Sequence, residues 1–99
     1  MQASYAPRFD REMGCTEAEW LHWLPGATRG HTLAVTSGAA SVAIGSGELR
    51  LAWQVLPPRR IALLCIPRLA VAFRFEGVDD AAREAFMRHF DLYTQRGGG

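Results

Sequence analysis

Residues 48–55 read Glu-Leu-Arg-Leu-Ala-Trp-Gln-Val, with a large apolar side chain at every second position. Successive side chains of a β-strand point to opposite faces, so this period of two predicts a strand with one apolar face. The same alternation recurs over residues 69–75. The two apolar rows are Leu49, Leu51, Trp53 and Val55, and Leu69, Val71, Phe73 and Phe75. We expect both rows to share one face of a sheet and to line the core.

Weaker strand signals precede this pair. Residues 9–13 are expected to form a short edge strand, and residues 32–35 and 40–44 to form two more strands. Ser37-Gly38 and the Gly45–Gly47 loop separate them with the glycine residues that tight turns favour. Because such short loops connect antiparallel neighbours, we expect a meander.

Prolines interrupt the chain between the two alternating segments. Proline cannot donate to a strand ladder, so Pro57-Pro58 is expected to end the first strand and Pro67-Arg68 to form another turn. Residues 61–66 between them are apolar on both faces. This pattern indicates a central strand covered from both sides, in which Cys65 is a small buried side chain.

A short helix is expected near the N-terminus. Thr16 and Glu19 have the spacing of a capping box, in which each side chain bonds to the other residue's backbone N–H. The helix is expected to run over residues 16–24, with both of its tryptophans on one face, and to end at Pro25-Gly26. Cys15 precedes it, a position that can lower the pKa of a thiol.

A longer helix is expected at the C-terminal end. Asp79 or Asp80 can cap its first turn. Its apolar side chains recur at helical spacing and form one stripe: Ala82, Phe86, Phe90 and Tyr93. Arg83 and Asp91 are expected to face water.

These elements predict one two-layer α+β domain over residues 1–94. It has about five antiparallel strands, a short N-terminal helix and a longer C-terminal helix packed on the sheet, followed by a flexible glycine-rich tail at 95–99. The order of strand, short helix, several strands and long helix resembles a reduced helix-grip domain. That resemblance implies a small apolar ligand held between the sheet and the C-terminal helix.

Composition narrows the function classes. The net charge is +1, which is not the strongly basic footprint of a nucleic-acid or anionic-membrane partner, so we expect neither. The chain has no lysine and no asparagine, which excludes Schiff-base lysine chemistry and suggests a GC-rich bacterial source. No apolar signal segment follows residues 1–14, so a cytoplasmic location is expected.

No catalytic, metal-binding or cofactor-binding motif is present, and an enzyme is the less favoured class. His22, His31 and His89 lack the short spacing of metal ligands. Serines and carboxylates likewise lack a motif context, so we expect no catalytic residue, no metal and no cofactor.

The second face of the sheet is the main functional signal. Ala52, Ala70 and Ala72 lie opposite the core rows, and an antiparallel sheet usually leaves such a face polar. Either the tryptophan helix or a second chain must cover it, and we expect the helix to cover part of it. Arg50 and Arg74 would then meet Glu48 or Glu76 of another copy.

We therefore expect an interaction module that forms a homodimer or binds a protein partner through this face. The alternative is a helix-grip pocket for a small apolar ligand. The candidate interaction or ligand residues are Trp20, Trp23, Leu24, Arg50, Trp53, Leu64, Arg74 and Phe86.

Overall fold

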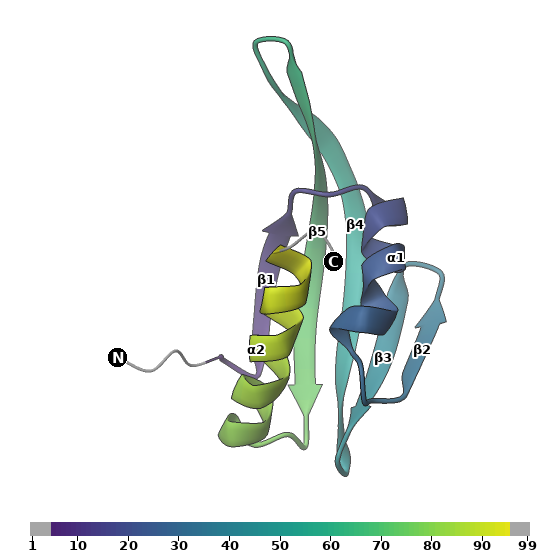
Figure 1. Cartoon of the computed structure of the whole chain (residues 1–99), viewed down its shortest axis with the longest axis vertical. Helices are drawn as coiled ribbons and strands as arrows, with labels where there is room; N and C mark the ends of the chain where they lie inside the picture. Colours follow the sequence, from purple (N-terminus) through teal and green to yellow (C-terminus); the bar gives the residue numbers. More distant parts are fainter. Residues whose placement is uncertain (1–4, 96–99) are drawn as a thin grey trace.

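The computed structural model describes residues 5–95, so residues 96–99 of the predicted tail lie outside the described residues, while Gln95 is the last residue of the C-terminal helix. Figure 1 shows two helices lying across one side of a five-stranded sheet. Neighbouring strands are antiparallel, in the order β1-β5-β4-β3-β2, which confirms the predicted α+β class. The elements are β1 (Arg8–Met13), α1 (Glu17–Ala27), β2 (Leu33–Thr36), β3 (Ala39–Ile44), β4 (Gly47–Ile61), β5 (Leu64–Glu76) and α2 (Asp80–Gln95).

The core lies between the sheet and the two helices. The predicted apolar rows of β4 and β5 are buried on the side of the sheet that the two helices cover, except Val55, which is 60% exposed. Phe90 contacts the rings of Trp20 and Phe73, so one aromatic cluster joins both helices to the sheet. The tryptophan helix therefore covers the same face as α2. This arrangement corrects the expectation that α1 would cover part of the second face.

Helix α1 begins as predicted and ends later. Thr16 and Glu19 form the capping box, with the Glu19 N–H donating to the Thr16 hydroxyl over 3.1 Å. The helix then continues through Pro25 to Ala27. It ends at Thr28, whose N–H and hydroxyl both donate to the Leu24 carbonyl. The predicted end at Pro25 was wrong because packing of the buried helix face holds the extra turn despite the proline.

Two side chains expected to face water instead anchor α2. Arg83 is 8% exposed, and it donates to the Val78 carbonyl over 2.7 Å and to the Tyr5 carbonyl over 3.0 Å. Asp91 accepts two hydrogen bonds from Arg11, of 2.5 and 3.1 Å. These contacts tie the helix to β1 and to the segment before it, while Asp79 caps the helix through the Ala82 N–H.

The largest departure from the prediction is the hairpin between β4 and β5. Both strands extend past Pro57-Pro58 and Pro67-Arg68, and the chain reverses at Ala62 and Leu63. A register shift between Leu56 and Arg59 accommodates the two adjacent prolines, because bulged residues need not donate to the ladder. Residues 61–66 are therefore the tip of a projecting hairpin, and neither a covered central strand nor a buried Cys65 exists there.

Candidate functional site

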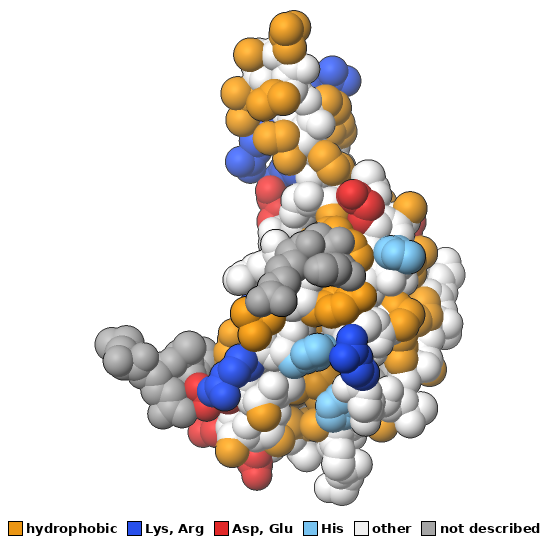
Figure 2. Space-filling view, viewed as in Figure 1, with side chains coloured by type: hydrophobic (Ala, Val, Ile, Leu, Met, Phe, Trp, Pro, Cys, Tyr) orange, Lys and Arg blue, Asp and Glu red, His pale blue; other side chains and the backbone are white. Residues whose placement is uncertain are grey.

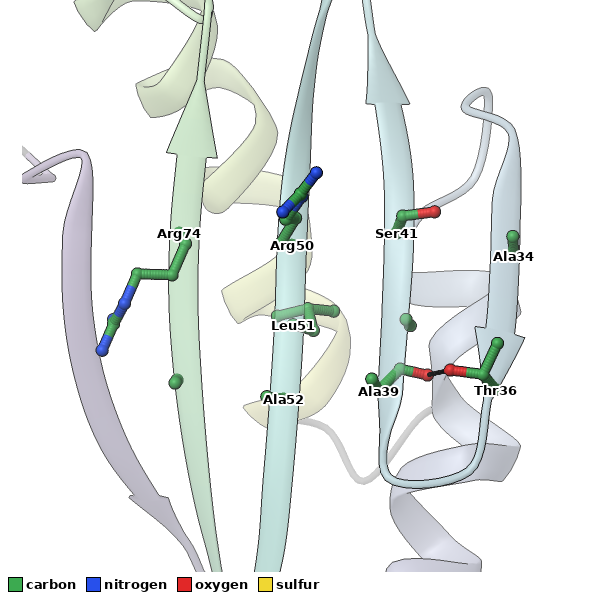
Figure 3. Close-up of a pocket in the computed structure, with 10 residues that line it drawn as sticks. Ala34, Thr36, Ala39, Ser41, Arg50, Leu51, Ala52 and Arg74 are labelled. Atoms are coloured by element: carbon green, nitrogen blue, oxygen red, sulfur yellow. Dashed lines mark hydrogen bonds between the residues drawn. The ribbon is translucent and has the colours of Figure 1, made fainter.

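The sheet has one face that points away from both helices, and we call it the open face (Figure 3). Residues paired across antiparallel strands share a face, so the register defines its members. Its central row consists of Ala39 on β3, Ala52 on β4 and Ala72 on β5. Within residues 5–95 no helix lies over this row. The predicted second face thus exists, and its small side chains lie at its centre.

A shallow hollow of about 430 Å³ lies on the open face around these alanines. Its lining comes from four neighbouring strands: Ala34, Thr36, Ala39, Ala40, Ser41, Arg50, Leu51, Ala52, Ala72 and Arg74. A second depression of about 350 Å³ adjoins it and shares Ala52 and Ala72. Alanine is depleted in strands because it gives its neighbours little to pack against. Here it leaves room for side chains from another surface.

The two arginines at this hollow are paired within the chain. Arg50 donates to the Glu48 carboxylate over 2.7 Å, and this contact raises the pKa of the guanidinium. Arg74 donates to Asp10 over 3.0 Å and to the Phe9 carbonyl over 3.1 Å. Such exposed pairs add little stability. Because each arginine at the hollow has a carboxylate beside it, neither positive charge is left without a partner. The hollow is therefore suitable for apolar side chains.

Residues 55–68 form a two-stranded extension of the sheet, which we call the arm. In Figure 2 it projects from the body, with hydrophobic atoms over much of its visible surface. Leu63 at its tip is fully exposed, and Ile61 and Leu64 are 51% and 63% exposed. Exposed apolar side chains gathered at one place indicate an interaction site.

The base of the arm is fixed to β1. Glu12 accepts from Arg68 over 2.8 Å and from Arg59 over 3.4 Å. The hydrogen bond from Arg68 is the main reason that the pKa of Glu12 lies below its usual value. Because the Glu12 carboxylate has a lower pKa in the folded than in the unfolded chain, its ionised form contributes stability at a pH above the unfolded pKa. This contribution is lost as the pH falls through the folded pKa. At neutral pH these exposed pairs link the base of the arm to β1.

The two cysteines have environments opposite to those expected, which gives a testable difference in reactivity. Cys65 is exposed on the arm, whereas Cys15 is buried, and burial raises the pKa of its thiol to about 11. Because the Cys15 thiol ionises at a higher pH in the folded than in the unfolded chain, its neutral form contributes to the free energy of unfolding. That contribution is complete below a pH of about 8.5 and is lost as the pH rises toward 11. We expect a disulfide reagent at pH 8 to modify Cys65 rapidly and Cys15 only after unfolding. The measurement is the number of thiols that react before and after denaturant; two equally fast thiols in the folded protein would contradict it.

The eight candidate residues do not form one site. Four of them are core residues: Trp20, Leu24, Trp53 and Phe86. Trp23 is partly buried against this core. Arg50 and Arg74 line the hollow, and Leu64 lies on the arm. The sequence reasoning missed the arm because it placed the tip residues in a covered strand.

Comparisons with protein-family models, with curated proteins and with solved structures each found no match to this chain. In the part of the chain that the structure describes, no group of three or more His, Cys, Asp or Glu side chains could hold a metal ion. No described helix is long and apolar enough to cross a membrane.

Proposed function

We propose that this protein is an interaction module that self-associates through the open face of its sheet. The observation that carries the proposal is the alanine row Ala39–Ala52–Ala72, which crosses three strands with neither described helix over it. Burying this row against a second copy removes apolar surface from water, which is the main driving force of association. A two-fold dimer is the commonest closed assembly of identical chains.

The position of α1 supports this proposal. Trp20 is fully buried and its ring lies 5.6 Å from that of Trp53, so α1 is held on the helix-covered face. Glu17 strengthens this position by accepting from the Trp53 indole N–H over 2.8 Å. Both described helices therefore lie on the core face, and the alanines stay available for a second copy.

Sedimentation at micromolar concentration tests the proposal. We expect a dimer, and we expect Ala52→Arg to shift it to a monomer because the long charged side chain fills the hollow. Ala81→Arg is the matched control, since Ala81 is exposed on α2 on the opposite side of the sheet. Both variants should keep the circular dichroism of the parent. A parent protein that sediments as a monomer, or a dimer that Ala52→Arg leaves intact, would refute the proposal.

A groove at one end of the helix layer supports a second candidate, the binding of a small apolar ligand. The groove has a volume of about 260 Å³ and lies between both helices and β3. Phe86 and Ile44 give it apolar walls, while His31 and His89 supply polar atoms. The binding of a small molecule commonly uses such a mixture of many apolar and few polar groups. A thermal-shift screen with fatty acids and apolar metabolites tests this candidate, and Phe86→Tyr should reduce any shift found.

A further inference from the structure

We propose that the arm is the docking element of the dimer, and that residues 55–68 of each copy lie across the open face of the other. The inference rests on the proposed self-association and specifies how it is achieved. The two copies are related by a two-fold axis near the base of the arm. Their open faces then lie opposite each other, and their strands run in opposite directions. Each arm then meets the alanine row of its partner, and the same two surfaces are used twice, as a closed two-fold interface requires.

The arm and the alanines present their side chains on the same side of the sheet. β5 is one unbroken strand from Leu64 to Glu76, and alternate side chains of a strand share a face. Leu64 and Ile66 therefore lie on the side that carries Ala70 and Ala72. A single copy thus has large apolar side chains at one end of this surface and small ones at the other. Turning a second copy end for end places the large side chains over the small ones.

The tip of the arm is apolar where a turn is usually polar. The hairpin reverses at Ala62-Leu63, and Ala62 has a φ of +54°. Two-residue hairpin turns with positive φ favour glycine or asparagine, which adopt this conformation readily. The leucine that follows Ala62 is fully exposed, which is unfavourable for a tip that remains in water. It is consistent with a tip that is buried in a complex.

Charge favours contact between arm and body over contact between two arms. The arm contains Arg59, Arg60 and Arg68 and no acidic residue. The strands of the body place four carboxylates and three arginines on the open face: Asp10, Glu12, Glu48 and Glu76, with Arg8, Arg50 and Arg74. Glu12 of the same copy already accepts from Arg59 and Arg68, so each arm together with this carboxylate keeps a net charge of +2. The remaining charges of the open face, three of each sign, cancel. Two arms in contact would therefore bring like net charges together, whereas an arm on the partner's body meets a face without net charge, which favours this orientation.

The arm enlarges the surface available for a dimer. Six of its residues share the face of Ala70 and Ala72 in the strand register: Leu56, Arg59, Ile61, Leu64, Ile66 and Arg68. Eight of the ten residues that line the hollow are at least partly exposed, because Ala40 and Leu51 belong to the core. An interface of standard size takes about 20–30 residues from each partner. The arm therefore nearly doubles the number of residues on this surface and brings the interface closer to that size.

Disulfide trapping tests this arrangement. In a Cys65→Ser background, one variant carries Leu64→Cys on the arm and another carries Ala52→Cys on the open face. Buried Cys15 stays outside the exchange. We expect a mixture of the two variants to give a cross-linked heterodimer under mild oxidation, and each variant alone to give none. Leu92→Cys, at an exposed site on α2, replaces Ala52→Cys as the control and should not cross-link. Ile66→Cys with Ala70→Cys is a second pair, since Ile66 and Ala70 are each two residues nearer the base of the arm than Leu64 and Ala72.

Each other outcome overturns the docking of arm on face. If the Leu64→Cys variant cross-links with itself, the arms of the two copies are in contact with each other. If the Ala52→Cys variant cross-links with itself, the two open faces are in direct contact. A dimer by sedimentation in which neither mixed pair cross-links leaves the proposed self-association standing without the arm. A monomeric parent protein would refute both the self-association and the docking of the arm. If such a monomer binds anionic vesicles, the arm is assigned to a lipid surface. As an independent measure, Leu64→Asp should weaken the dimer at least about tenfold.

Discussion

Replacing Phe90 with alanine is expected to lower the free energy of unfolding by about 3–5 kcal/mol, the range for a large-to-small change in a core. Phe90 has no exposed surface, and its ring centroid lies 5.6 Å from that of Phe73 and 5.9 Å from that of Trp20. The substitution would leave a cavity where α1, α2 and β5 meet. Urea unfolding followed by circular dichroism measures the change.

The matched control is on the same helix. Leu92 is 50% exposed, so Leu92→Ala should change the free energy of unfolding by about 0.5 kcal/mol or less. Both variants should be compared with the parent at one protein concentration, because the stability of a dimer depends on concentration. A loss below about 1 kcal/mol for Phe90→Ala would mean that α2 does not pack on the sheet as described.

The core could be predicted from the sequence because its signals are local. The alternation along residues 48–55 and 69–75 and the helical spacing of Phe86 and Phe90 each predict one buried face. The structure pairs these faces directly, with Leu51 opposite Phe73 and Phe90 against Phe73. An apolar helix face and an apolar sheet face leave water by packing on each other, so the two-layer architecture could be predicted from them.

The arm could not be predicted from the same kind of signal. Residues 61–66 are apolar on both faces, a pattern that suits a strand covered by its own chain and equally a hairpin tip that another molecule covers. The prolines at 57–58 added to the error, since a proline pair usually ends a strand but can also occupy a bulge. Only the position of the hairpin relative to the body separates these alternatives.

The candidate site was predicted in part. Arg50, Ala52, Ala72 and Arg74 lie on the face opposite the core, as their alternation indicated. The sequence could not specify which face α1 covers, because both faces of the sheet offer apolar side chains to its tryptophans. Packing decided between them: the core face gives Trp20 two aromatic neighbours, whereas the alanines of the open face offer only methyl groups.

A second large effect is expected at Gly47, the first residue of β4. A Cβ atom at this position would lie 2.3 Å from the Gly77 carbonyl oxygen and 2.4 Å from that of Glu76. Backbone carbonyls cannot rotate away as a side chain can, so Gly47→Ala must displace the end of β5. We expect a loss of about 1–3 kcal/mol in the free energy of unfolding, the range for overpacking.

The displaced segment matters because it sets where α2 begins. Val78 is buried directly after it, and Asp79 caps the helix through the Ala82 N–H. Gly14→Ala is the matched control, since no atom lies within 4 Å of a Cβ built there, and it should leave stability within about 0.5 kcal/mol of the parent. Equal stabilities for the two variants would show that the β4–β5 edge is not held closely at Gly77. A selective loss for Gly47→Ala would show that the backbone of Glu76 and Gly77 packs too closely on β4 to accept a Cβ atom at this position.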